Sequence, residues 1–166
     1  SITSDPRPVS QIDMHEIDSL NYVKLDLLGL NAVGLIDGAC KLAGINYLTP
    51  DKVNFSDENV INSIAEDTTL IFQFESGFAS DSLKRTLSKE TLENIKAQND
   101  NISYLDVMAM VSGAIRPAGE SYREQLFNGI YKDNGNEALN EFLKPTLGYL
   151  VYQEQIIDFL HDFCGF

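Results

Sequence analysis

The chain has 166 residues, and its 25 acidic and 12 basic side chains give a formal net charge of −13 at pH 7. This charge excludes a domain that holds nucleic acid by its own positive surface, and a hydrophobic fraction of 43% is ordinary for a folded globular domain. No run approaches the ~18 apolar residues of a membrane span, no signal-peptide pattern opens the sequence, and the cysteines are only two, so we expect a cytoplasmic protein without a membrane contact.

The strand signals lie near the N-terminus. The stretches VSQID (9–13) and YVKLDLL (22–28) alternate apolar and polar residues, so two short strands that pair in antiparallel fashion are expected. A helix follows over NAVGLIDGACKLAG (31–44), because apolar residues recur there at helical spacing. Gly44 is placed to end this helix in the left-handed conformation.

Most of the remaining chain is predicted to be helical. Three serines precede expected helices and are candidate N-caps: Ser56, Ser88 and Ser103. The helix after Ser103 is the most apolar and is expected to end at Pro117. Further helices are expected in GESYREQLFNGIYKDNG, in NEALNEFL and, after a short strand, at the C-terminal end. The predicted fold class is therefore α+β, with short antiparallel strands near the N-terminus followed by a mostly helical segment.

One further stretch, TLIFQFES (69–76), is β-branched and aromatic, which favours a strand or a buried extended segment. Four large apolar side chains in the helical part are predicted to lie in the core: Phe72, Phe74, Met108 and Met110.

Seven of the ten residues in the segment NYVKLDLLGL (21–30) are apolar, Tyr or Gly, yet Lys24 and Asp26 interrupt them two residues apart. In a strand these two side chains would share one face. They could form a structural ion pair at a sheet surface, worth ~0–1 kcal/mol when exposed. Alternatively, they could belong to a site that needs an anionic and a cationic group side by side. Spacing alone favours the structural pair.

Common catalytic signatures are absent from the sequence, among them GxSxG, Walker A, HExxH and GxGxxG. Four short stretches nevertheless occur in a distinctive order: VKLDLLGL (23–30), IFQFES (71–76), IRPAG (115–119) and LGYLVYQEQ (147–155). Together they resemble the α subunit of bacterial DNA polymerase III, the C-family replicative polymerases of the DnaE type. The resemblance covers nearly the whole chain.

The resemblance implies a DNA-directed DNA polymerase that adds nucleotides to a primer 3′-hydroxyl by two-metal chemistry. Asp26 matches a catalytic aspartate on a palm strand of that family, so it is the candidate catalytic and metal-binding residue, and Mg²⁺ is the expected cofactor. Lys24 would neutralise charge on the incoming triphosphate or its metal ion. Arg116 matches the arginine of the family's RPG turn and is a candidate contact to the nucleotide or template. A structural role, bracing the turn after a buried helix, is equally open for Arg116.

Polar residues of the second and fourth stretches either line a site or satisfy buried backbone groups. The structural role is favoured for most of them: Gln73, Glu75, Ser76, Tyr152, Gln153, Glu154 and Gln155.

By the same resemblance, residues 1–50 correspond to the C-terminal part of the palm and 51–166 to the N-terminal part of the helical fingers. The chain is then expected to be a polymerase fragment that is inactive alone, because the family's other two catalytic aspartates precede the matched region. The implied partners are a primed DNA template and dNTP, the rest of the polymerase chain, the sliding clamp and other replisome subunits.

Two other classes of function were weighed against the polymerase. An acidic helical module that binds a protein partner without catalysis fits the charge, but it does not account for four polymerase stretches in order. A small metal-dependent hydrolase built around Asp26 lacks companion ligands near it in the sequence.

Overall fold

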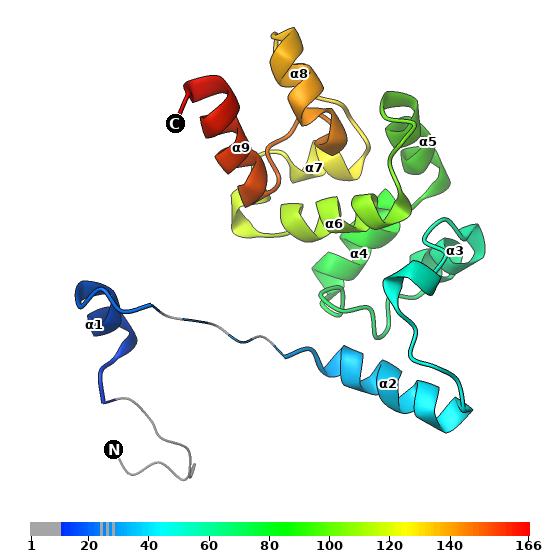
Figure 1. Ribbon diagram of the computed structural model, residues 1–166. Coiled ribbons are helices and arrows are strands. Elements are labelled where there is room, and N and C mark those ends of the chain that lie inside the picture. Colours follow the sequence, from blue (N-terminus) through cyan, green and yellow to red (C-terminus); the bar gives the residue numbers. More distant parts are fainter. Residues whose placement is uncertain (1–10, 24, 26, 28) are drawn as a thin grey trace. The chain divides into compact units, whose positions relative to one another are not determined.

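The computed structural model describes residues 11–23, 25, 27 and 29–166. The chain forms two compact units, Ser1–Leu48 and Thr49–Phe166. The helices of each are labelled in Figure 1. The predicted assignment of 1–50 to a palm and 51–166 to fingers is not tested by this division and stays a prediction.

The first unit contains α1 (Met14–Ser19) and α2 (Asn31–Ala43). The predicted helix over 31–44 is confirmed, and Gly44 ends it with a left-handed φ of 68° and an N–H bond to the Lys41 carbonyl at 3.2 Å. On the outside of α2 an ion pair joins Asp37 to Lys41, four residues apart, with an N···O distance of 2.6 Å. Cys40 is the buried residue of this helix.

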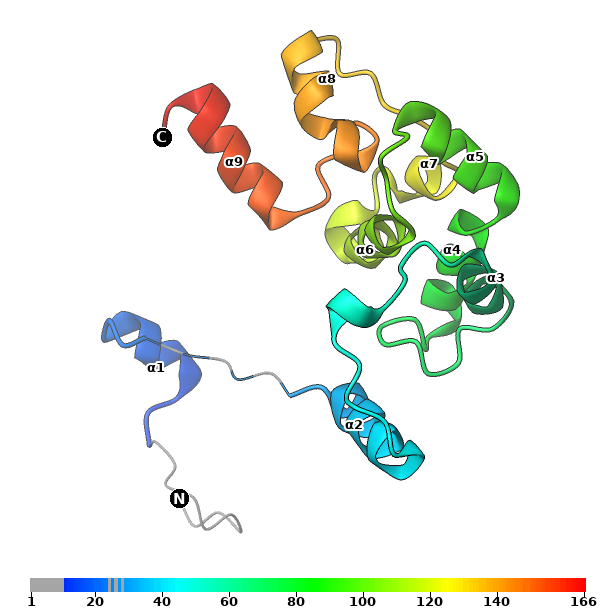
Figure 2. The same cartoon turned by 45° about the vertical axis from the view of Figure 1, so that its right-hand side comes forward.

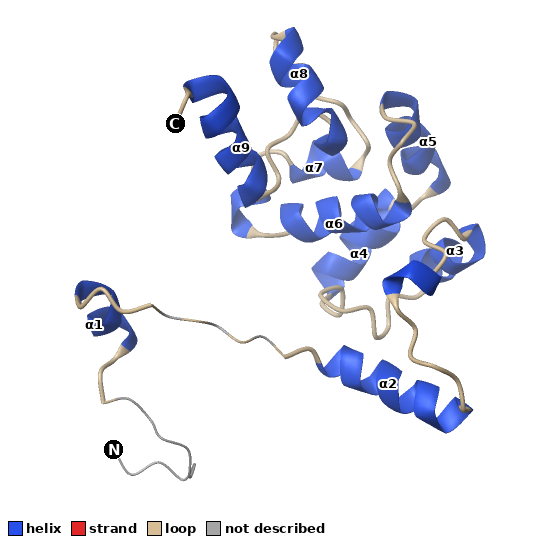
Figure 3. Ribbon diagram, viewed as in Figure 1, coloured by secondary structure: helices blue, strands red, loops and turns tan. Residues whose placement is uncertain are grey.

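The predicted α+β class is wrong, because none of the residues that the structure describes lies in a strand (Figure 3). A strand needs a neighbour to satisfy its backbone groups, and a lone hairpin is marginal in water. In the described part of 22–28, Leu25 and Leu27 are 82% and 96% exposed and have no second strand beside them. The fold described is all-α.

The second unit is built from seven α-helices with three short 3₁₀ turns between them. The α-helices are α3 (Glu58–Glu66), α4 (Gly77–Thr86), α5 (Lys89–Gln98), α6 (Tyr104–Ala114), α7 (Arg123–Phe127), α8 (Glu137–Leu143) and α9 (Gln153–Cys164). The 3₁₀ turns are η1 (Pro50–Lys52), η2 (Pro117–Gly119) and η3 (Lys144–Thr146). Helices α4 and α6 pack together at the centre, with α3 and α5 against α4 and α7 against both (Figures 1 and 2).

The core of this unit lies where α4, α5, α6 and α7 meet. Met110 and Phe74 are buried there, as predicted, and Met108 packs against the core while staying partly exposed. The prediction for Phe72 is wrong, because its side chain is 51% exposed. Other fully enclosed members of the core include Leu83, Ile95, Val111, Leu126 and Phe127.

The segment 69–76, predicted to be a strand or a buried extended segment, is a series of turns. Leu70 and Gln73 have φ values of 66° and 70°. An extended strand cannot contain residues in the left-handed region, so the β-branched and aromatic composition misleads here. Turn bonds replace the ladder, with the N–H of Phe74 bonded to the Ile71 carbonyl at 3.0 Å.

Several helices of the second unit begin at a residue whose side chain caps the first turn. Ser88 and Ser103 cap α5 and α6 as predicted, and Ser103 forms a capping box with Asp106. The cap of α3 is Asp57 rather than Ser56, since the Asp57 carboxylate accepts the Asn59 N–H at 2.9 Å. None of the helices in the described part of the chain is long and apolar enough to cross a bilayer.

Candidate functional site

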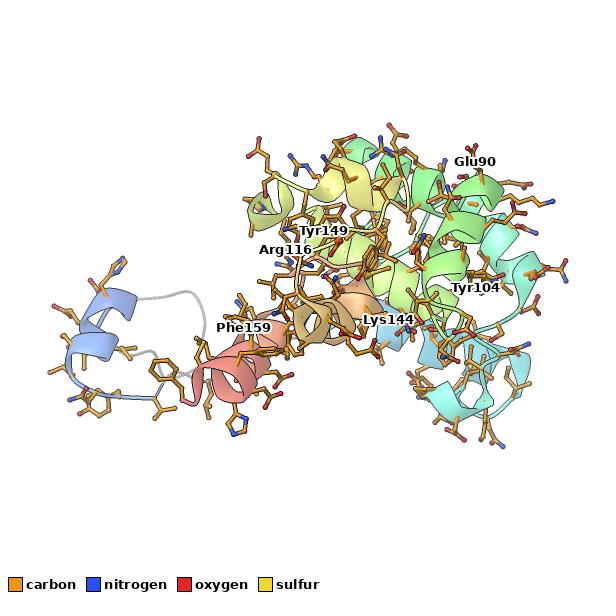
Figure 4. All side chains as sticks on the ribbon, turned by 90° about the horizontal axis from the view of Figure 1, so that it is seen from above. Glu90, Tyr104, Arg116, Lys144, Tyr149 and Phe159 are labelled. Carbon is orange, nitrogen blue, oxygen red and sulfur yellow. The ribbon has the colours of Figure 1, made fainter. Side chains whose placement is uncertain are left out.

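The turn that carries Arg116 follows directly after α6. Pro117 occupies the first position of η2, and the Gly119 N–H bonds to the Arg116 carbonyl at 2.9 Å. A Cβ atom on Gly119 would lie 2.1 Å from the Ala114 carbonyl oxygen, so this tight turn requires glycine. The Arg116 side chain is exposed and has no ion-pair partner among the described residues, which leaves the guanidinium free for a ligand (Figure 4).

The stretch before α9 is fixed by one glutamine. The Gln155 Oε1 atom accepts the backbone N–H groups of Val151 and Tyr152 at 2.9 and 3.0 Å. The Gln155 Nε2 atom donates to the hydroxyl of Thr146 at 2.7 Å, and that hydroxyl bonds to the Tyr149 carbonyl at 2.6 Å. Gln155 therefore satisfies backbone groups, which is the structural role that the sequence analysis favoured.

The third and fourth stretches meet around one cavity of about 330 Å³. Its lining comes from the end of α6, the Arg116 turn and the start of α9: Gly113, Arg116, Val151, Tyr152, Gln153 and Glu154. A Cβ atom on Gly113 would lie 2.6 Å from a methyl carbon of Val151, so the absence of a side chain lets α6 approach this segment. Arg116 and Val151, 35 positions apart in sequence, thus line one small site whose lining includes one cation, Arg116, and one carboxylate, Glu154.

Tyr152 contributes a neutral phenol to this cavity. Burial raises its pKa to about 12, with smaller contributions in the same direction from the nearby Asp106 carboxylate and the Tyr122 phenol. At neutral pH the hydroxyl is therefore protonated and can donate a hydrogen bond to an anionic or carbonyl oxygen. An arginine and a phenol together suit an oxygen-rich ligand such as a phosphate.

The IFQFES stretch (71–76) is bonded to α6 next to this cavity. The hydroxyl of Ser112, which precedes Gly113, donates to the side-chain oxygen of Gln73. Ser76 caps α4 by accepting the Ala79 N–H at 3.3 Å. Gln73 therefore joins the turn before α4 to α6, Ser76 caps α4, and Glu75 is exposed.

The predicted catalytic pair cannot be placed in this geometry, because Lys24 and Asp26 lie outside the described residues. Their roles stay predictions. Among the residues that the structure describes, no group of three or more His, Cys, Asp or Glu side chains could hold a metal ion. The described residues alone therefore do not fit a magnesium site.

The sequence analysis did not identify Gly113 and Val151 as parts of the site. An internal glycine in an apolar helix often marks a close approach of another segment, and Gly113 was such a signal. Val151 gave no comparable signal, because an apolar residue next to a helix is ordinary core composition.

Comparison with known proteins supports the resemblance. The family model for the finger domain of the bacterial DNA polymerase III alpha subunit matches residues 33–166. The chain is similar to the DNA polymerase III subunit alpha of Ureaplasma parvum, with 30% identity over 96% of this chain and 16% of that protein. It is also similar to the protein of the same name from Vibrio cholerae, with 27% identity over 96% of this chain and 14% of that protein. A third similar protein is the DNA polymerase III subunit alpha of Campylobacter jejuni, with 30% identity over 95% of this chain and 13% of that protein.

The chain thus spans 13 to 16% of the length of these curated relatives. No solved structure matches it significantly.

Proposed function

This chain belongs to the finger-domain family of bacterial DNA polymerase III alpha subunits, and from that premise we propose that it forms the finger region of a replicative DNA polymerase. The observation that carries the proposal is the cavity at the end of α6. Arg116 lines it together with the first three residues of the YQEQ stretch (152–155). We assign the cavity to the incoming nucleotide or the template beside it.

Arg116 is the residue that would contact the substrate. Its guanidinium is exposed, and no carboxylate among the described residues pairs with it, so it keeps its full charge for a phosphate. Tyr152 and Gln153 would add hydrogen bonds to the sugar or phosphate oxygens. Gln155 acts on the substrate only through the position of Tyr152, because its own polar atoms are engaged with the protein.

Asp26 and Lys24 complete the proposal as contributors to the catalytic centre. Asp26 would supply one carboxylate to a magnesium site whose other ligands come from outside this chain. Magnesium, when bound there, would stabilise charge on the reacting phosphates. Lys24 would neutralise further negative charge on the triphosphate.

The 166 residues alone would not extend a primer. Their net charge of −13 repels the DNA backbone, so basic surface must come from elsewhere in a polymerase. The proposed partners are therefore a primed template and dNTP, further polymerase segments, and the sliding clamp and other replisome subunits. Replication chemistry of this kind would take place in the cytoplasm.

The test is primer extension by a complete polymerase that contains this chain, with Arg116→Gln compared with wild type. A charge-assisted hydrogen bond contributes ~1.5–3 kcal/mol, so kcat/KM for dNTP should fall about 10- to 150-fold. The matched control is Arg123→Gln, which removes the same charge from an arginine that packs over the Phe78 ring at 5.1 Å. The control should lose some stability and keep its kcat/KM within a few-fold.

Two outcomes would contradict the proposal. Equal effects of Arg116→Gln and Arg123→Gln would mean that the cavity has no substrate role. Wild-type synthesis by a complete polymerase that carries Asp26→Asn would mean that this chain supplies no carboxylate to the catalytic centre.

A further inference from the structure

A second cavity lies on the same unit, beside α7 and before α9. Its volume is about 480 Å³, within the range of small-ligand sites. Three tyrosines and one lysine dominate the lining, which consists of Ser121, Tyr122, Gln125, Tyr131, Lys132 and Tyr149. None of these residues is acidic, although the chain as a whole has about twice as many acids as bases. We call this space the tyrosine–lysine cavity.

The aromatic wall is held in place before any ligand arrives. Tyr122 and Tyr149 stack with ring centroids 5.2 Å apart and an interplanar angle of 21°. The Tyr149 hydroxyl donates to the Ile130 carbonyl at 2.9 Å and its ring is buried, so it forms the floor. Tyr122 and Tyr131 stay half-buried and offer ring surface to the cavity. Burial raises the pKa of both Tyr122 and Tyr149, so the phenols stay neutral toward an anion.

The lysine has a fixed backbone and a free side chain. The Lys132 N–H bonds to the Leu147 carbonyl at 2.9 Å, and the Lys132 carbonyl lies so close to Gly148 that a Cβ there would come within 2.0 Å. The Lys132 ammonium has no ion-pair partner among the described residues. The rigid backbone fixes the position of the Lys132 Cα atom beside the cavity, and the exposed side chain is ordered only when it meets an anion.

Lys132 is the one charged residue among those that line the cavity, and two carboxylates close to the lining along the chain have other partners. Asp133 accepts the Gly135 N–H at 2.8 Å and the Asn140 amide at 2.6 Å. Glu124 on α7 pairs with Arg85 at 3.0 Å. Lys132 therefore sets the sign of the charge that the cavity offers to a ligand.

We propose that the tyrosine–lysine cavity binds an unpaired nucleobase together with the phosphate next to it. The base lies against the tyrosine rings, and the phosphate lies at the Lys132 ammonium. Aromatic platforms beside a cation are the common way to hold unpaired bases without reading their sequence. The choice of a nucleotide among aromatic anions rests on the proposed function, and two sources share this chemistry, single-stranded DNA and a free nucleotide.

The first measurement is photo-cross-linking of a complete polymerase that contains this chain to an oligothymidine of roughly 15 nucleotides that carries 5-iododeoxyuridine. Irradiation at low salt followed by peptide mapping should give adducts at Tyr122 or Tyr131. Competition with dTTP and with unlabelled oligonucleotide separates the two sources, since the true ligand suppresses the adduct at the lower nucleotide concentration. Adducts confined to other segments, or no adduct at low salt, would overturn the inference.

The second measurement is fluorescence anisotropy with the same oligonucleotide, labelled with fluorescein. Tyr131→Leu should weaken binding about 5- to 150-fold, the loss of one stacked base, while Tyr131→Phe keeps the ring and binds within a few-fold of wild type. Lys132→Gln should lower the slope of log K against log salt by about 0.7. Lys89→Gln removes the same charge from the exposed surface of α5 and should leave the slope within error of wild type.

Wild-type binding by Tyr131→Leu and Lys132→Gln would overturn the inference. The proposed function would stand or fall separately, because its test is the dependence of primer extension on Arg116. A polymerase that loses synthesis with Arg116→Gln while the tyrosine–lysine cavity binds no oligonucleotide would refute the inference alone.

Discussion

The Gln155 side chain offers a sharp test of how the site is built. Gln155→Ala removes a group that accepts two backbone N–H bonds, at 2.9 and 3.0 Å, and donates one to Thr146 at 2.7 Å. Each protein hydrogen bond contributes about 0.5–1.5 kcal/mol, and a partner left buried and unpaired costs about 1–3 kcal/mol. Because these groups are partly buried, solvent can replace some of the lost bonds. We expect the free energy of unfolding to fall by about 2–4 kcal/mol.

The assay is urea denaturation of this chain, monitored by circular dichroism at 222 nm with an m-value fitted for each variant. The matched control is Gln153→Ala, because Gln153 lies two residues away on the same helix and is exposed. The control should change the free energy of unfolding by less than about 0.5 kcal/mol. Equal destabilisation by the two substitutions would refute the assignment of Gln155 as the residue that fixes this segment.

Three further outcomes are expected. Gly148→Ala should unfold much of the second unit in the same urea assay, because φ is +85° there and the new Cβ would lie 2.0 Å from the Lys132 carbonyl oxygen. A fall of less than about 1 kcal/mol in the free energy of unfolding would contradict this expectation. Ser103→Ala should cost about 1 kcal/mol by removing the capping box with Asp106, whereas a neutral result in thermal melts would show that α6 needs no cap. Tyr152 should ionise last in an alkaline titration followed at 295 nm, because its pKa is raised from 10.0 to about 12. The folded state then loses stability as the pH rises from about 10 through 12. A Tyr152 transition near pH 10 would refute its burial.

The local pattern predicted most helices of the second unit, because their signals are carried by a few adjacent residues. Ser88 and Ser103 stand directly before α5 and α6, and a cap acts over a single turn. Gly44 likewise ends α2 with the left-handed φ that glycine adopts without strain. The amphipathic stretch after Gly119 was harder, since only Arg123–Phe127 is an α-helix.

The strand predictions failed for a different reason. An apolar and β-branched composition indicates that a segment can be extended. A strand forms only where a neighbouring strand completes its backbone hydrogen bonds. In the described part of 22–28 no neighbour is present, and at 69–76 two left-handed residues, Leu70 and Gln73, turn the chain instead. Phe72 was wrongly predicted to lie in the core, because the left-handed turn at Gln73 separates it from Phe74 and only Phe74 is buried.

By itself the sequence determined several helix ends, the acidic character of the chain and the family, because these depend on charges and on motifs of neighbouring residues. It also named Arg116 and the YQEQ stretch as candidates. The tertiary structure alone decided that these two share a cavity, because their contact depends on the close approach that Gly113 permits to Val151. It also decided that Tyr122, Lys132 and Tyr149 line one cavity, because the turn at Gly148 brings segments on either side of α8 together, and no local pattern encodes a contact over that separation.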